Sequence, residues 1–271
     1  MTDATVDSPA VVTTPAVRPE KEGGASALRH ILTIAKREIT GYFASPVAYV
    51  FIVIFLLLTG FFAFMVSGFF ERGQANLLAF FAWHPWLYLF LVPAVGMRMW
   101  SEERRLGTIE LLLTMPITPW QAIVGKFLAS WLVLALALAL TFPIVLTVNY
   151  LGRPDNGVIL ASYAGSLLLS GAYLSVSAMT SAMTRNQVVS FIVSVVLCLF
   201  LILAGWPPIT NMLSQWASAW FVETIAAFSV MTHFESIQKG VIDSRDVLFF
   251  FSVIGFCLFT TSVIIRAHRA G

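Results

Sequence analysis

Long stretches without a charged residue recur along this 271-residue chain. The first of them, residues 46–70, is long enough to form a helix that crosses a hydrocarbon layer of about 30 Å. Charged residues make up only 11% of the sequence, and hydrophobic residues make up 58%, whereas soluble domains contain about 25% charged residues. The chain is therefore not expected to be a water-soluble domain, and the pattern predicts an all-α, polytopic membrane protein.

Six uncharged stretches are candidates for membrane-spanning helices. The predicted spans are residues 46–70, a segment that ends near Met99, and residues 127–151, 156–184, 186–207 and 247–265. The start of the second span is open, because Trp83, Trp86 and Tyr88 resemble an interfacial aromatic belt. In that interpretation residues 71–82 lie on the outer surface.

Residues 209–246 are the least certain part of this division. Trp216 and Trp220 lie in an apolar helical pattern that would allow a seventh span. That span would place Glu223 near the middle of the membrane, at a cost of about 3 kcal/mol, and would move the basic C-terminus to the outside. We therefore expect outer-face or re-entrant helices in this segment.

The chain before the first span has two parts. Residues 1–27 have no apolar period and predict a disordered cytoplasmic tail. Residues 28–44 place Lys36, Arg37 and Glu38 opposite an apolar face, which predicts an amphipathic interfacial helix; a helix packed on a neighbour is the alternative. Residues 45–271 form the predicted six-span transmembrane domain, which begins at Ser45 and Pro46 with a helix cap and a first-turn proline.

The distribution of basic residues predicts the orientation of the chain. With the N-terminus inside, the inner side holds 12 of the 16 Lys and Arg residues and the outer side holds 4. Both termini are therefore expected to be cytoplasmic.

The predicted spans contain few side chains that could carry protons, bind ions or take part in catalysis. Apart from Arg98 they contain no Asp, Glu, Lys or Arg, whereas a proton- or sodium-coupled transporter needs ionisable groups at membrane depth. His84 is expected at the interface, and no pair of groups suits intramembrane hydrolysis. Cys198 and Cys257 lie in apolar runs and provide neither a disulfide framework nor a metal site. The net charge of +2 is not gathered into a basic domain, so no nucleic acid partner is expected.

The most informative segment, residues 100–120, joins the second and third spans on the predicted cytoplasmic side. Gly107 can end the incoming helix, Thr108 can cap a new one, and Pro116 can stop it. Thr118 and Pro119 can then cap and start the next span. The short helix over residues 109–115 is apolar nearly all round, which is typical of a docking surface for another protein. A helix that dips into lipid is the alternative.

This segment resembles the coupling segment of ABC-2 type transporter permeases. The shared pattern begins with Glu102-Glu103-Arg104-Arg105, continues through Gly107-Thr108, Glu110 and Pro116, and is followed by the pair Gly125-Lys126. The resemblance extends over residues 28–271. Ser45-Pro46, Thr184 to Gln187 and His233 to Asp243 look most like the gliding-motility (GldF-like) subgroup, which is related to the permease of the nitrous-oxide-reductase maturation system.

The resemblance implies a half-transporter that pairs with a second copy of the permease and with two ATP-binding cassette subunits in the bacterial cytoplasmic membrane. It leaves room for an outer-face or membrane auxiliary subunit. ATP and Mg would bind to the partner chain, because this sequence has no phosphate-binding loop. The chain is accordingly expected to have no enzyme activity and no cofactor of its own.

The resemblance also assigns a role to the short helix, which would dock in a groove of the ATP-binding subunit. The residues assigned to ATPase coupling are Glu102, Glu103, Arg104, Arg105, Gly107, Thr108, Ile109, Glu110, Leu111, Leu112, Leu113, Met115 and Pro116.

Three functions are compatible with these features. The first is a permease subunit that couples ATP hydrolysis in a separate subunit to substrate translocation. The second is a membrane scaffold or mechanotransmitter, driven by the same ATPase, that acts on an outer partner through residues 209–246 without solute transport. A passive channel is the third.

Overall fold

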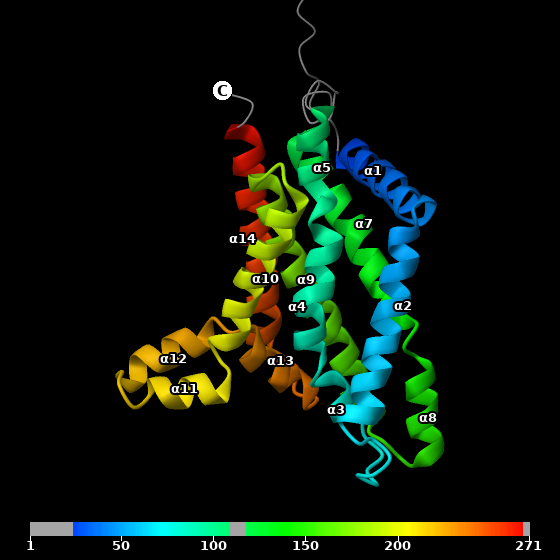
Figure 1. The fold of residues 1–271 in the computed structure, drawn as a ribbon, viewed down its shortest axis with the longest axis vertical. Helices are drawn as coiled ribbons and strands as arrows, with labels where there is room; N and C mark the ends of the chain where they lie inside the picture. The colour runs from blue at the N-terminus through cyan, green and yellow to red at the C-terminus, as the bar shows by residue number, and fades with distance from the viewer. Residues whose placement is uncertain (1–23, 109–117, 268–271) are drawn as a thin grey trace, which may run out of the picture.

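The computed structural model describes residues 24–108 and 118–267. Within these two ranges every regular element is a helix, in agreement with the all-α prediction. Most of the long helices run side by side along one direction (Figure 1). In chain order the elements are α1 (Gly24–Ala44), α2 (Pro46–Phe61), the π-helical turn η1 (Phe62–Val66), α3 (Leu78–Phe81), α4 (His84–Gly96), α5 (Arg98–Leu106), α7 (Pro119–Ala139), α8 (Pro143–Leu151), α9 (Asn156–Met183), α10 (Gln187–Leu203), α11 (Pro207–Leu213), α12 (Ala219–Ala227), α13 (Val230–Gln238) and α14 (Ser244–Ala267).

Five helical stretches in the described ranges are long and apolar enough to cross a membrane. They are Ala48–Val66, Leu78–Leu106, Pro119–Leu151, Asn156–Met183 and Ser244–Ala267. A sixth span results if Gln187–Leu203 and Pro207–Leu213, which are bent by 67° relative to each other, are counted together. The structure therefore supports a polytopic membrane protein with five or six spans.

Residues 209–246 do not form a seventh span. They contain the end of α11 and the helices α12 and α13, and neither α12 nor α13 is longer than nine residues. A helix of nine residues is too short to cross the hydrocarbon layer. The segment lies at one end of the bundle (Figure 1), and its placement on the outer face or as a re-entrant segment stays a prediction.

Two predicted helix starts are confirmed. α2 begins at Pro46, and α7 begins at Pro119 after a capping box formed by Thr118 and Gln121. The third span consequently starts before Lys126 rather than at Phe127, where the uncharged stretch begins. A charged side chain is tolerated inside this helix because it has partners within the protein, as described below.

α9 is the central helix of the bundle. It packs against α4, α5, α7, α10, α13 and α14, and most of its residues are buried. Small side chains make this packing possible: a methyl group added at Gly96 of α4 would clash with the Cβ atom of Ser177 in α9. Close approach of helix backbones through Gly and Ser is a common way to pack helices within a membrane.

His84 is buried in the bundle rather than at an interface, which corrects the sequence interpretation. Its Nδ1 atom lies 2.9 Å from the hydroxyl oxygen of Ser166 in α9, and its ring stacks on Phe55 and Tyr88. The Ser166 hydroxyl already donates to the carbonyl of Ser162. Nδ1–H of His84 therefore donates to Ser166, and the ring serves to hold α4 against α9.

α1 packs on α7 at the end of the bundle that also holds α5 and the last turns of α14 (Figure 1). We call this the α1 end. The opposite end holds α3 and α11 to α13, and we call it the arm end because α11 and α12 project sideways from it (Figure 1). Ile34 and Ala35 are buried in this contact, whereas Leu28 and Leu32 are exposed. The helix thus combines packing on a neighbour with an apolar exposed face, and its position at a membrane surface stays a prediction.

Candidate coupling site

The predicted coupling segment leaves the bundle at the α1 end. It follows α5, which ends at Leu106, and it precedes α7, which begins at Pro119. Residues 109–117 lie outside the described residues, so the predicted helix with Ile109, Glu110, Leu111, Leu112, Leu113 and Met115, and its stop at Pro116, are not tested here. The structure does describe both helices to which the segment is attached.

A buried lysine joins three helices at this end. Lys126 of α7 is only 5% exposed, and its ammonium nitrogen lies 3.2 Å from Oε1 of Glu38 in α1 and 2.9 Å from Oε1 of Glu103 in α5. The same nitrogen lies 5.5 Å from the centre of the Trp100 ring, a contact that favours a cation. One positive charge therefore bridges two carboxylates from separate helices.

Gly125 explains how α1 comes close enough for this bridge. A Cβ atom at this position would lie 2.9 Å from Cγ2 of Ile34 and 3.1 Å from the carbonyl oxygen of Ile31. No side chain larger than hydrogen fits without a shift of α1. The two neighbouring residues thus act together: Gly125 admits α1, and Lys126 binds its carboxylate.

The electrostatics of Glu38 reflect this arrangement. Burial on its own raises the pKa of a carboxyl group, but the Lys126 ammonium and, to a lesser extent, Arg37 outweigh burial and hold the pKa of Glu38 below its usual value of 4.5. One turn further along α1, Tyr42 hydrogen-bonds Ser130 of α7 at 2.9 Å, and burial raises the pKa of this tyrosine. α1 is therefore attached to α7 by an ion pair and a neighbouring hydrogen bond.

A polar cavity of about 340 Å³ lies between these helices. Arg98, Glu102 and Glu103 of α5 line one side, and Glu38 and Lys126 line another. Oε2 of Glu103 is buried and has no hydrogen-bond partner within the described residues. A cavity with charged walls of this size has room for water, which can satisfy such an atom.

Of the other residues predicted to act in coupling, Arg104 contacts α9, whereas the described residues from Arg105 to Thr108 are exposed. Arg104 donates a hydrogen bond to the carbonyl of Ala182, at the C-terminal end of α9 where carbonyls lack helical partners. Gly107 ends α5 in the left-handed conformation, with φ of 72°, as the sequence predicts, and the Thr108 hydroxyl lies 3.4 Å from the carbonyl of Glu103. Glu103 and Arg104 thus attach α5 to the bundle, and the helix ends three residues after Glu103, at Leu106.

α5 is joined to α4 by a break in the helix at Met97, and Ser181 of α9 stabilises this junction. Its hydroxyl oxygen accepts hydrogen bonds from the backbone N–H groups of Trp100 and Ser101, both at 3.0 Å, and it donates to the carbonyl of Met97 at 2.9 Å. One side chain therefore bonds backbone groups on both sides of the junction between α4 and α5.

Sequence reasoning missed the partners of Glu103. The sequence interpretation placed Glu38 on the polar face of a surface helix, and it named Lys126 as part of the pair Gly125-Lys126 that follows the coupling segment, without a partner. It did not single out Ser181, which is one of many small residues in α9. The residues that meet here are far apart in the chain, and no local spacing connects them. A lysine directly after a glycine in an otherwise apolar helix is the one signal that was available.

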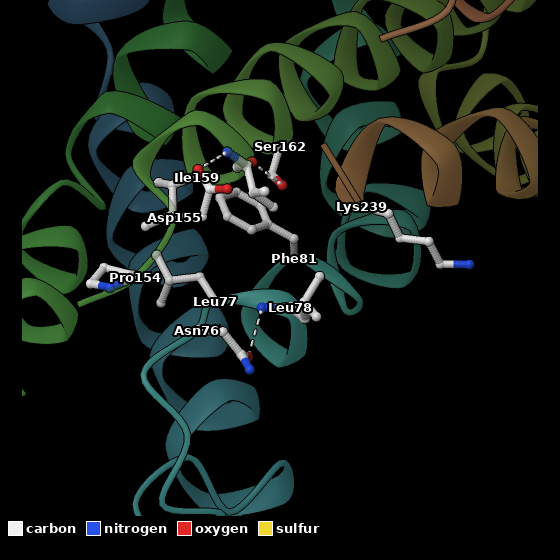
Figure 2. Close-up of a pocket in the computed structure, with 10 residues that line it drawn as sticks. Asn76, Leu77, Leu78, Phe81, Pro154, Asp155, Ile159, Ser162 and Lys239 are labelled. Carbon is white, nitrogen blue, oxygen red and sulfur yellow. Dashed lines mark hydrogen bonds between the residues drawn. The ribbon is translucent and has the colours of Figure 1, made fainter. Parts of the chain in front are cut away.

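A second cavity, of about 310 Å³, lies at the arm end between α3, α9 and the end of α13 (Figure 2). Leu77, Phe81 and Ile159 give it an apolar lining. Two of its polar side chains are hydrogen-bonded to the backbone. Asp155 accepts hydrogen bonds from N–H groups at the start of α9, and Ser162 donates to backbone carbonyls. Within the described ranges no three His, Cys, Asp or Glu side chains are placed to bind a metal.

Comparison with known proteins assigns a family to this architecture. The family model described as ABC-2 family transporter protein matches residues 71–265, which include the predicted coupling segment and every span after the first except the final two residues of the last one. Among curated proteins, none matches the sequence. The family match covers most of the chain, and the described helices include five or six candidate membrane spans. The chain belongs to the ABC-2 transporter family, as a multi-pass transmembrane subunit of an ABC transporter that works with ATP-binding subunits.

Proposed function

We propose that this chain couples ATP hydrolysis in two separate ATP-binding cassette subunits to the translocation of a substrate across the bacterial cytoplasmic membrane. It does so as half of a homodimer, with both termini in the cytoplasm and with ATP and Mg bound only by the partner subunits. We infer that it belongs to the gliding-motility (GldF-like) subgroup, related to the nitrous-oxide-reductase maturation permease, and the support for this is the resemblance of the sequence motifs described above. Family membership supports the assignment as a transmembrane subunit of an ABC transporter. The contacts at the α1 end support the coupling role.

The observation that carries the proposal is the bridge from Lys126 to Glu38 and Glu103. Glu103 belongs to the helix that leads into the coupling segment, and Lys126 belongs to the helix that leads out of it. Both flanking helices are parts of spans, Leu78–Leu106 and Pro119–Leu151. A force on residues 107–118 is therefore passed to two spans and, through Glu38, to α1.

Rigid-body movement is the simplest way for such a force to travel. α5 is a short helix held at its base by Ser181, so it can act as a lever about the break at Met97. Glu103 and Lys126 keep the start of α7 moving with this lever. Tilting of these two spans would open a path at the interface between the two permease copies.

The docking part of the proposal is tested with Leu112→Asp, because a charge on the apolar helix predicted from the sequence opposes burial in a protein groove. We expect at least a tenfold loss of ATP-binding subunit that co-purifies with the permease, at unchanged permease yield. Leu28→Asp, which changes an exposed leucine of α1, is the matched control and should retain the partner. An unchanged complex with Leu112→Asp contradicts docking at this segment.

Transport itself is tested with the purified complex in vesicles. ATP-dependent movement of a solute supports a transporter. The alternative function, a mechanotransmitter that acts through residues 209–246, predicts ATP hydrolysis without solute movement and a stable protein partner on that segment. A passive channel would be stable and active without any ATP-binding subunit.

A further inference from the structure

The segment between α10 and α13 forms a lateral arm at one end of the bundle. The arm consists of residues 205–229 and contains α11 and α12, which project sideways from the long helices (Figure 1). α11 is turned by 67° from the direction of α10. The arm therefore runs across the direction of the spans, at the level where they end.

The base of the arm is closed. A Cβ atom at Gly205 would lie 2.5 Å from the Cβ atom of Ser229, so the two ends of the arm meet, and the Ser229 hydroxyl donates to the carbonyl of Leu201 in α10 at 3.0 Å. Nε2 of His233 lies 3.1 Å from the carbonyl of Ala227, at the end of α12. The arm is thus fixed to the bundle at its base, while α11 packs mainly on α12.

The surface of the arm is apolar and uncovered. Both of its helices fall within the described residues, and neither contains a buried side chain. Trp216 is 88% exposed, Trp220 is 73% exposed and Phe228 is 67% exposed. Glu223 is the one ionisable residue in the arm. An aromatic surface of this extent is unfavourable in water, so it needs a cover.

We propose that the arm lies in the headgroup and acyl-chain boundary of the leaflet at the arm end, and that lipid is the cover. Two observations favour lipid over a protein partner: the arm lies along the plane in which the spans end (Figure 1), and its most exposed residues are tryptophans, which prefer this boundary. Because the arm has no Lys or Arg, apolar area rather than attraction to anionic lipid holds it in place.

This position gives the arm a mechanical role at the arm end. Its base is bonded to α10 through Ser229 and, through His233, to α14, where Nδ1 of His233 lies 2.7 Å from a carboxylate oxygen of Asp246. An arm held at constant depth sets the height of both helices in the bilayer. α10 and α14 then move by tilting about their ends at the arm, rather than by sliding along the membrane normal.

The proposal is tested by measuring the depth of a nitroxide label in the intact permease in phosphatidylcholine vesicles. The two native cysteines, Cys198 and Cys257, are buried, so a cysteine introduced by Trp216→Cys is labelled selectively. Phe200→Cys, at an exposed position of α10, is the lipid control, and Arg153→Cys, in an exposed loop at the same end, is the water control. Trp220→Cys is a second arm variant in case the first does not fold.

We expect the arm label to collide with oxygen more often than with a water-soluble nickel chelate, at a depth of about 5–10 Å below the headgroups. Addition of phosphatidylglycerol should leave this depth unchanged. A label as accessible to the nickel chelate as the Arg153→Cys control would show that the arm stands in water. A label shielded from both reagents would show a protein cover, and a label as deep as the Phe200→Cys control would show a re-entrant helix. Each of these three results overturns the proposal.

Discussion

Lys126 carries the central charge of the α1 end. Its ammonium group is buried between Glu38 and Glu103, so the favourable Coulomb energy of two contacts compensates for the loss of water around one cation. The arrangement is sensitive to the loss of the Lys126 charge, because its removal leaves two carboxylates close together with no counterion between them.

We therefore expect Lys126→Met to lower the free energy of unfolding by about 3 kcal/mol, the size of effect seen when one partner of a buried ion pair is removed. The measurement is chemical or thermal unfolding of the purified protein in detergent. Arg105→Met, which removes an exposed charge from α5, is the control and should change stability by less than about 0.5 kcal/mol. Equal effects of the two variants would show that the bridge contributes nothing to stability.

The pKa of Glu38 predicts a loss of stability in acid. Since its pKa in the folded protein is below 4.5, the ionised carboxylate stabilises the fold at all pH values above 4.5, and this contribution is lost as the pH falls through the lower folded pKa. We expect Glu38→Gln to reduce the fall in Tm between about pH 6 and about pH 3.5. An unchanged slope in this variant would mean that Glu38 does not titrate with folding.

The contact of α1 with α7 shows how a single glycine decides the position of an element. Gly125 allows the α1 backbone to lie against α7, and this approach is what brings Glu38 within reach of Lys126. The α4–α5 junction depends in a similar way on one residue, Ser181, whose hydroxyl serves three backbone groups.

Gly125→Ala should separate α1 from α7, because the added carbon would lie 2.9 Å from Ile34 and 3.1 Å from a carbonyl oxygen. We expect destabilisation by about 1–3 kcal/mol, the range for overpacked sites, together with faster hydrogen exchange in α1. Gly41→Ala in α1 is the matched control. No neighbouring atom within the described residues lies within 4 Å of its added carbon, so this variant should be neutral or stabilising.

Ser181→Ala should loosen the α4–α5 junction, since it leaves two backbone N–H groups without their acceptor at a cost of about 1–3 kcal/mol. We expect faster amide exchange at Trp100 and Ser101, measured by hydrogen–deuterium exchange and mass spectrometry. In the assembled transporter this variant should also weaken the link between ATP hydrolysis and transport. Exchange at the native rate would show that the junction is held by other contacts.

At the scale of the whole molecule, the distribution of charged residues agrees with the proposal that ATP-binding subunits drive the movement of the spans. In the described spans every Asp, Glu, Lys and Arg lies near one end of its helix, and His84 is packed in an aromatic cluster bonded to Ser166. α9 connects most of the other spans. Displacements at the α1 end can therefore reach many helices, while the membrane interior offers little for a proton to bind.

We accordingly expect ATP-driven transport by the assembled complex to be independent of the proton gradient. A protonophore added to vesicles that contain the complex should leave the transport rate unchanged within about twofold, since no carboxylate is available at mid-membrane in the described spans. A secondary transporter assayed in parallel is the control for the protonophore. Loss of transport after collapse of the gradient would contradict an ATP-only energy source.

Much of the architecture could be predicted from the sequence because the physics of membrane insertion is local. Uncharged stretches set the spans, Pro46 and Thr118 set helix starts, and Gly107 sets a helix end. The division of residues 209–246 into short helices followed from the cost of burying Glu223 in lipid. The predicted helix at residues 109–115 lies outside the described residues and stays a prediction.

The arrangement at the α1 end was decided by tertiary structure alone. Whether Glu38 faces water or Lys126 depends on how closely α1 approaches α7, and no local pattern encodes that distance. His84 was misplaced for the same reason, because its burial results from contact with α9. Sequence by itself determined which segments enter the membrane, since transfer free energy adds up along a segment. Only the packing of distant helices decided which polar groups meet, since hydrogen bonds and ion pairs depend on distances of a few ångströms.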